Sequence, residues 1–325
     1  ADLAREETPD DAVLRDWYET HGVPYRRGVK GVGGYPDDFD MGNHSLQKLR
    51  VSSYRGLVFG SFSTEVESIE DYLGENLRGY LDSRFEKPVK VLGNMRQTIP
   101  SNWKLYYENV KDPYHAGLLH LFHATFGIYR STQRGGGLMN DSKHSSVLFN
   151  IGGKYDKKEA REQYAGQDKY NEDYDLFDSS LMYVHPDHDD GVANMIMSIF
   201  PSLVVQQIHN TLATRHIRPR GPDSFELYWT YLGYEDDDEE LTQHRLRQAN
   251  LVGPAGYISM EDGEATASVQ QAIKNSGDTH SIIEFGGRGP IEDTDNLLNE
   301  TSIRGFWREY ARLMNFEVAK SEAVA

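Results

Sequence analysis

Three histidines, two acidic residues and an amide gather around one predicted helix start in residues 102–123. Asp112 is a good helix N-cap, and the proline that follows it suits the first helical position. A helix that begins here and runs to about residue 126 would carry His115 in its first turn, with His120 and His123 further along. Neutral imidazole nitrogens suit divalent iron, zinc or copper, so this segment is the first candidate for chemistry.

Two pairings of these histidines compete for a metal ion. On an ideal helix, His120 and His123 are three residues apart and share a face, whereas His115 and His120 lie about 140° apart around the axis. Spacing alone therefore favours His120 with His123. Two histidines and one carboxylate would make the facial triad of non-haem iron. The alternative is a capped helix whose histidines bind carbonyl groups or face solvent.

Several motifs in this segment resemble the catalytic-domain signature of the Rieske non-haem iron ring-hydroxylating oxygenases. They are Asn102-Trp-Lys, Glu108-Asn109, Asp112-x-x-His115 and His120. The resemblance implies that His115 and His120 are both iron ligands. It also implies that Asp112 is the family's bridging aspartate, which connects an iron ligand to the cluster histidine of a neighbouring subunit. Asn109 would position water or orient the site.

The third ligand is implied by residues 253–263, which resemble the later family segment in which a carboxylate follows the glycine-proline step by eight residues. Asp262 occupies that position. The adjacent Glu261 is the alternative third ligand. If it is not a ligand, we expect it to be a solvated acidic residue of a helix. The implied ligand set is His115, His120 and Asp262.

Two arginines are candidates for binding an acidic substrate. The segments 206–215 and 301–307 resemble the aromatic-acid branch of the family, whose substrates are of the terephthalate, salicylate or anthranilate type, and they contain Arg215 and Arg304. A guanidinium group can hold a carboxylate with two parallel hydrogen bonds. The alternative for each arginine is an ordinary surface ion pair.

Composition narrows the possible partners and cofactors. The 325 residues carry 34 Lys and Arg against 51 Asp and Glu, a net charge of −17, which argues against nucleic acid and anionic membranes. The absence of cysteine excludes Cys nucleophiles, and it excludes ligands for a [2Fe-2S] Rieske cluster in this chain. That cluster is expected in the full enzyme, so either the Rieske region is not included here or the protein is a cluster-less relative. No apolar stretch reaches the ~20 residues of a membrane span, and a cytoplasmic location is the default expectation.

The sequence pattern predicts the helices and strands that must position these residues, and together they indicate an α+β fold. Strands are expected at 49–53, 56–62, 89–99, 145–151, 194–199, 203–209, 211–218, 224–234 and 281–285, and helices at 68–85, 102–110, 113–126, 239–251, 253–275 and 296–315. Residues 155–190 are polar and acidic and are expected to form a long loop or lid. We expect residues 1–45 to be a lead-in segment, possibly a remnant of a Rieske domain, and residues 46–325 to be a mononuclear iron catalytic domain. The resemblance implies a helix-grip domain, with a curved antiparallel sheet around a long helix.

The implied function is hydroxylation of an aromatic carboxylate with O2 at a mononuclear Fe(II) site. Electrons would come from NADH through a reductase or ferredoxin and a Rieske cluster, in a homotrimer with or without a small β subunit. Two other functions stay open from the residues: a carrier of hydrophobic ligands without catalytic activity, and a zinc hydrolase in which Glu108 would have to serve as the general base.

Overall fold

The computed structural model describes residues 47–126, 129–130, 132–140, 143–150, 157–277 and 280–316. The chain divides into two compact units, residues 1–69 and 70–325. In the first unit, β1 (Arg50–Tyr54) and β2 (Leu57–Ser61) pair as an antiparallel hairpin. The predicted lead-in of residues 1–45 lies outside the described residues. Among the described residues, no helix has the length and apolar character needed to cross a membrane.

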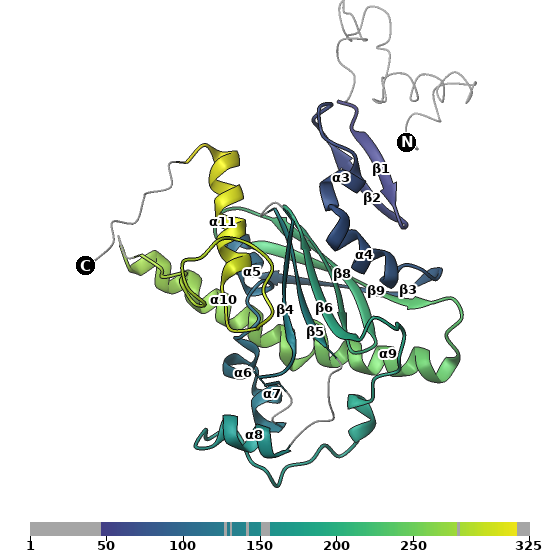
Figure 1. Ribbon diagram of the computed structural model, residues 1–325, viewed down its shortest axis with the longest axis vertical. Helices are drawn as coiled ribbons and strands as arrows, with labels where there is room; N and C mark the ends of the chain where they lie inside the picture. The colour runs from purple at the N-terminus through teal and green to yellow at the C-terminus, as the bar shows by residue number, and fades with distance from the viewer. Residues whose placement is uncertain are drawn as a thin grey trace, which may run out of the picture. The chain divides into compact units, whose positions relative to one another are not determined.

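The second unit is built on one seven-stranded antiparallel sheet with the strand order β3-β9-β8-β7-β6-β5-β4 (Figure 1). The strands are β3 (Val89–Ile99), β4 (Gly135–Asn140), β5 (His144–Asn150), β6 (Val192–Ile199), β7 (Leu203–Ile208), β8 (Thr211–Pro219) and β9 (Phe225–Tyr234). All neighbours pair antiparallel, and sequential strands β4 to β9 are joined in order. The α+β prediction is confirmed.

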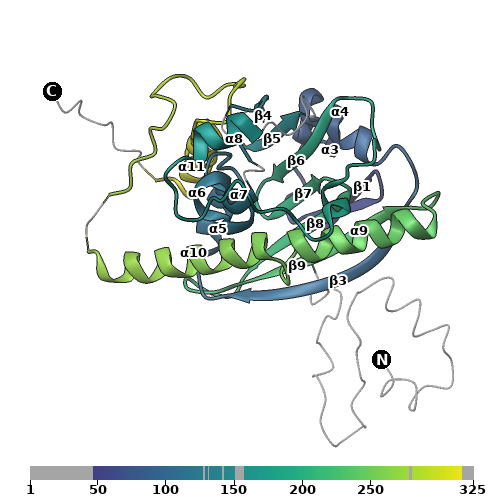
Figure 2. The same ribbon diagram turned by 90° about the horizontal axis from the view of Figure 1, so that it is seen from below.

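Helices cover this sheet, and the helices together with the segments that join them carry most of the candidate residues. They are α3 (Ile69–Leu73), α4 (Glu75–Arg84), α5 (Trp103–Asn109), α6 (Ala116–Leu119), α7 (Leu121–Phe126), α8 (Lys157–Tyr164), α9 (Glu239–Val252), α10 (Tyr257–Asn275) and α11 (Thr301–Met314). Helices α9 and α10 follow each other along one side of the sheet (Figures 1 and 2). Helix α10 contacts α5 and α7, so it faces the segment that holds the three histidines.

Local sequence signals explain where two of these helices begin. The side chain of Asn102 accepts a hydrogen bond from Lys104 N and caps α5. Asp238 accepts one from Leu241 N and caps α9, whose first turn carries two further acids that suit the helix dipole. The helix predicted to begin at residue 239 therefore begins there, at the end of the acid run 235–240.

A core of aromatic side chains fixes α5 and α11 against the sheet. Tyr106 and Tyr107 of α5 are fully buried and pack with Trp229 of β9 and Phe306 of α11. The rings of Tyr107 and Phe306 meet edge to face, with centroids 4.9 Å apart. Because α5 ends at Asn109, this packing also anchors the chain that leads into the histidine segment.

The prediction of a single helix over residues 113–126 is wrong. His120 has φ −77° and ψ 106°, an extended conformation, and it separates α6 from α7. The carboxylate of Glu261 accepts a hydrogen bond from Leu121 N at 3.0 Å. This contact from a distant helix replaces the bond that a continuous helix would make, so the break is not visible in local sequence.

Three other expectations differ from the structure. The helix predicted at 68–85 is divided at Gly74, whose φ of 73° is a backbone conformation that residues with a side chain rarely adopt. No strand forms at 281–285, where Phe285 N instead binds the Glu300 carboxylate. Strand β4 was not predicted because it is rich in glycine; a Cβ on Gly136 would lie 1.9 Å from Thr294 O, so the close approach of that segment requires glycine.

The described part of residues 155–190 is mostly irregular, with α8 and one 3-10 turn at Ser179–Met182. Arg245 of α9 holds its C-terminal part by hydrogen bonds to both carboxylate oxygens of Asp187. The same guanidinium group binds Asp237 in a pair that is almost fully buried. The segment is thus attached to α9 near residue 187.

Candidate metal centre and its pocket

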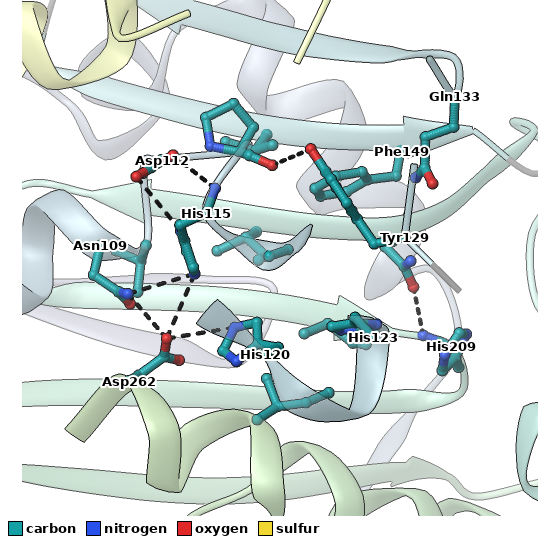
Figure 3. A pocket seen from close by; sticks show the side chains of 18 of the residues that line it. Asn109, Asp112, His115, His120, His123, Tyr129, Gln133, Phe149, His209 and Asp262 are labelled. Carbon is teal, nitrogen blue, oxygen red and sulfur yellow. Dashed lines mark hydrogen bonds and ion pairs between the residues drawn. The ribbon is translucent and has the colours of Figure 1, made fainter. Parts of the chain in front are cut away.

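His115, His120 and Asp262 converge from three different positions in the fold (Figure 3). His115 is the N-cap residue of α6, His120 lies between α6 and α7, and Asp262 projects from the second turn of α10. The Nε2 atoms of both histidines lie 3.5 Å from Asp262 Oδ1. One ligand atom from each residue lies within 4.8 Å of the other two, close enough for all three to bind a single ion.

The outer nitrogen of each histidine faces a second carboxylate. His115 Nδ1 lies 3.6 Å from Asp112 Oδ2, and His120 Nδ1 lies 3.0 Å from Glu261 Oε2. Metal-binding histidines commonly donate their second N–H to a carboxylate, which fixes the ring orientation and leaves the other nitrogen free for the metal. With Nδ1 protonated, both Nε2 lone pairs would point towards Asp262.

Asn109 completes the arrangement on the side of α5. Its side-chain Nδ2 donates a hydrogen bond to Asp262 Oδ1 at 2.9 Å and lies 3.5 Å from His115 Nε2. This contact orients the buried carboxylate of Asp262 towards the histidines. Glu261, the alternative ligand considered from sequence, has both oxygens engaged with His120 and Leu121 N, on the outer side of the cluster.

The charges of this cluster suit a cation. Burial lowers the pKa of His115, but hydrogen bonds and charge from Asp112 and Asp262 outweigh burial and raise it to about 10. Burial raises the pKa of Asp262, yet His115 and His120 bring it below its usual value. A proton on His115 therefore occupies the place where a divalent ion would sit, and metal binding would displace it. The donor set of two nitrogens and one carboxylate fits Fe(II).

The cluster opens into a pocket of about 820 Å³, counting the space that reaches solvent. Its walls come from α5 to α7, α10 and the face of the sheet formed by β5 to β8. The lining is largely apolar, as expected of a small-molecule site. Its apolar residues include Val110, Pro113, Ala116, Tyr129, Val147, Phe149, Ile196, Ile208 and Ile258.

Arg215 lines this pocket and is only 4% exposed. Its Nη1 donates to the Tyr106 hydroxyl at 2.9 Å, and its guanidinium lies 4.6 Å from the centroid of the Trp229 ring. No carboxylate lies within ion-pair distance of Arg215 in the part of the chain that the structure describes, and its Nε has no partner there. A buried cation without a counter-ion is costly unless a ligand supplies the negative charge.

The family model for the ring hydroxylating alpha subunit (catalytic domain) matches residues 74–315. This chain belongs to that family. The predicted membership of the ring-hydroxylating oxygenases is therefore confirmed, as is the prediction that the chain comes from an oxidoreductase.

Relatives and solved structures agree with this assignment. The chain is 48% identical to the anthranilate 1,2-dioxygenase large subunit of Burkholderia cepacia, over 91% of this chain and 70% of that protein. It is 44% identical to an alpha subunit of terephthalate 1,2-dioxygenase from Comamonas sp, over 91% of this chain and 71% of that protein. The naphthalene 1,2-dioxygenase of Rhodococcus sp. bound to indole has the same fold, with a TM-score of 0.65 and 20% identity. That alignment covers 82% of this chain and 66% of the other, so the chain spans about two thirds of that structure.

Within this oxygenase domain, two pocket residues were not predicted from sequence. His209 was not considered, and His123 was considered only as a competing ligand. Both line the pocket. Burial lowers the pKa of His123 to about 3 and that of His209 to about 4, and the nearby His209 contributes to the shift of His123. A signal for His209 could have been its place in the short turn between two predicted strands, because turn residues at the end of a sheet often face a ligand.

Two further candidate residues, Arg304 and Asp112, differ in their relation to the pocket. Arg304 is not among the residues that line the pocket, and its guanidinium binds Gly289 O and the Thr301 hydroxyl. A role for Arg304 in substrate binding stays a prediction. Asp112 lines the pocket, accepts hydrogen bonds from the backbone of Tyr114 and His115, and has a side chain 16% exposed.

Proposed function

We propose that this domain hydroxylates the ring of an aromatic carboxylate with O2 at an Fe(II) ion held by His115, His120 and Asp262. The proposal is supported by the convergence of these three residues and by their placement at a largely apolar pocket. It is also supported by relatives at 41–48% identity, which are named as large or alpha oxygenase subunits for anthranilate, terephthalate and salicylate.

The observation that carries the substrate class is Arg215. It is buried in the same pocket as the proposed ligands, and no described carboxylate neutralises it. A ring carboxylate would supply the missing charge, and its two oxygens match the guanidinium fork. Tyr106 and Trp229 hold the side chain in one position, so the acid group of the substrate would be fixed relative to the metal.

The residues around the ion have distinct roles in this proposal. Bound Fe(II) would supply the activation of O2, which the protein's own side chains cannot provide. Asp112 and Glu261 hold the histidine rings so that Nε2 faces the ion, and Asn109 orients Asp262. The apolar wall excludes water and keeps the ring of the substrate against the metal.

Electron supply requires parts that this chain does not contain. We infer that electrons reach the site from NADH through a reductase or ferredoxin and a Rieske cluster, for which the cysteine-free chain offers no thiolate ligands. In a quaternary ammonium Rieske monooxygenase of similar fold, electron transfer is inter-subunit. Asp112, beside His115 and partly exposed, is the residue we assign to such a bridge in a trimeric assembly.

An iron assay combined with product analysis tests this proposal. The protein should bind about one Fe(II) per chain, and with a Rieske cluster and reductase it should convert a benzoate-type acid to a hydroxylated product. Tight binding of aromatic acids to a protein that takes up no iron would instead favour a ligand carrier.

A further inference from the structure

Two histidines other than the proposed ligands line the pocket from neighbouring elements. His123 belongs to α7, and His209 occupies the turn between β7 and β8. Figure 3 shows their rings together, on the side of the pocket away from Asn109 and Asp112. His123 is also close to a proposed ligand, with its ring centroid 5.6 Å from that of His120.

Neither ring has a hydrogen-bond partner among the described residues. The Nδ1 atoms of both His123 and His209 are shielded from water and unpaired. The buried rings of His144 and His244 each have one partner, since His144 Nδ1 accepts a bond from Phe200 N and His244 Nε2 contacts Tyr183 O, although His144 Nε2 is unpaired as well. Because Nδ1 is shielded, a ligand that enters the pocket would reach each ring at Nε2, which also has no hydrogen-bond partner among the described residues.

The backbone of His209 supports the same interpretation. Its φ is 53°, in the left-handed region that residues other than glycine adopt infrequently, although histidine, like asparagine, is found there more often than most. Hydrogen bonds fix this conformation: His209 N donates to Asn194 Oδ1 at 2.7 Å, and His209 O accepts from the Gln207 side chain at 3.2 Å. The turn thus holds an unfavourable backbone conformation while presenting an imidazole to the pocket.

The charges around these rings limit what they can bind. His115 and His120 each face a carboxylate, whereas no described carboxylate lies within ion-pair distance of His123 or His209. Neither ring therefore has a charged partner that would favour its protonated form. A neutral imidazole has one donor and one acceptor nitrogen, so the pair suits a hydroxyl or amino group, whereas a second carboxylate would lack a counter-charge.

We propose that His123 and His209 form a second subsite that recognises a neutral hydrogen-bonding substituent, hydroxyl or amino, on the ring of the aromatic acid. The inference rests on the proposed function and extends it. Arg215 would bind the carboxylate, and the histidine pair would select rings that carry a second polar group. Substituted acids of this kind should bind more tightly than benzoate, and 1,4-benzenedicarboxylate should not gain from the pair.

The test compares affinities for a set of ligands on the Fe(II)-loaded chain, by calorimetry without O2. The ligands are benzoate, the three hydroxybenzoates, 2-aminobenzoate and 1,4-benzenedicarboxylate. We expect at least one hydroxy- or aminobenzoate to bind about ten-fold more tightly than benzoate, the difference that one or two neutral hydrogen bonds produce. His123→Phe should remove this preference, so that the ratio of the affinities for the substituted acid and for benzoate falls to about one.

Matched variants separate recognition from packing. His123→Gln keeps a polar atom near the Nε2 position and should retain part of the preference, whereas His209→Asn, which tolerates the left-handed conformation but ends near the shielded Nδ1, should lower it without unfolding the turn. His216→Phe is the control because His216 is an exposed residue of β8 that does not line the pocket. It should change neither affinity nor preference.

Each contrary result has a distinct meaning. If benzoate binds to the original protein but substituted acids gain nothing, the subsite is refuted while the proposed function stands. Equal loss of benzoate and hydroxybenzoate affinity in His123→Phe, or loss of iron, would also overturn the subsite. Failure of every aromatic acid to bind the iron-loaded protein would refute the proposed function itself, and the subsite with it.

Discussion

Exchanging the two neighbouring carboxylates of α10 one at a time should separate the metal ligand from its support. In Asp262→Asn, the amide keeps the shape of the side chain but loses the charge that faces both Nε2 atoms. In Glu261→Gln, the amide oxygen can still accept from His120 Nδ1, while the charge at 3.0 Å is removed. We therefore expect Asp262→Asn to abolish tight iron binding and Glu261→Gln only to weaken it.

The size of the Glu261 effect follows from its contact with His120. A hydrogen bond to a charged group contributes about 1.5–3 kcal/mol, which corresponds to roughly ten- to hundred-fold in a dissociation constant. Loss of such an outer carboxylate typically costs a metal site the same ~10–100-fold. Because glutamine preserves an acceptor, Glu261→Gln should lie near ten-fold.

The assay is competition for Fe(II) against a chelator of known affinity, under anaerobic conditions. Glu264→Gln provides the matched control, since Glu264 is an exposed acid of the same helix and should have no effect. Retention of iron by Asp262→Asn together with its loss in Glu261→Gln would make Glu261 the ligand and refute the reasoning. Equal and complete loss in both variants would show that the two carboxylates cannot be assigned separate roles.

Four further variants test other residues of the domain. Arg215→Met should raise the dissociation constant of benzoate roughly ten- to hundred-fold, with iron content and the binding of neutral aromatics little changed. Arg304→Met should have a smaller effect, because Arg304 lies outside the pocket lining. Calorimetry with benzoate and with a neutral aromatic ligand measures both effects. Asp112→Asn should keep iron but block coupled turnover in an enzyme that carries the Rieske cluster, and unchanged turnover would remove the bridging role. His144 is fully buried, and burial lowers its pKa to about 3, so below pH 6.5 the unfolded chain binds a proton that the folded chain does not. As the pH is lowered from 6.5 to 3, this group should therefore decrease the free energy of unfolding by up to about 1.4 kcal/mol per pH unit. Urea titrations of His144→Gln at several pH values should show a weaker dependence of the free energy of unfolding on pH.

Much of the fold could be predicted because local patterns determine it. Alternating apolar residues indicated strands β6 to β9 within two residues of their observed ends, and Asn102 identified the start of α5. Strand β4 was not predicted because two of its glycines are required by close approaches of distant residues, Leu148 O at Gly135 and Thr294 O at Gly136, which no local pattern reveals. The strand expected at 281–285 failed for the opposite reason: its apolar residues suggest β structure, but Glu300 binds the backbone there.

The candidate site was harder to predict from residue spacing than from motif resemblance. Spacing favoured His120 with His123, because it assumed one continuous helix. The resemblance implied His115 with His120, and the structure brings the Nε2 atoms of that pair to the same oxygen of Asp262. Arg215 was predicted, but its lack of a counter-ion was not, since the absence of a partner among the described residues is a property of the whole pocket.

Glu261 explains why spacing and geometry disagree. One oxygen of its carboxylate accepts from Leu121 N, at the point where the helix would have continued, and the other binds His120 Nδ1. The same side chain therefore favours the extended conformation of His120 and sets the orientation of its ring. An intact helix would leave His115 and His120 about 140° apart, so the break is a condition for the pair to meet one ion. Formation of the proposed metal site is thus coupled to the packing of α10 against α7, and a sequence pattern within residues 113–126 alone could not have contained that information.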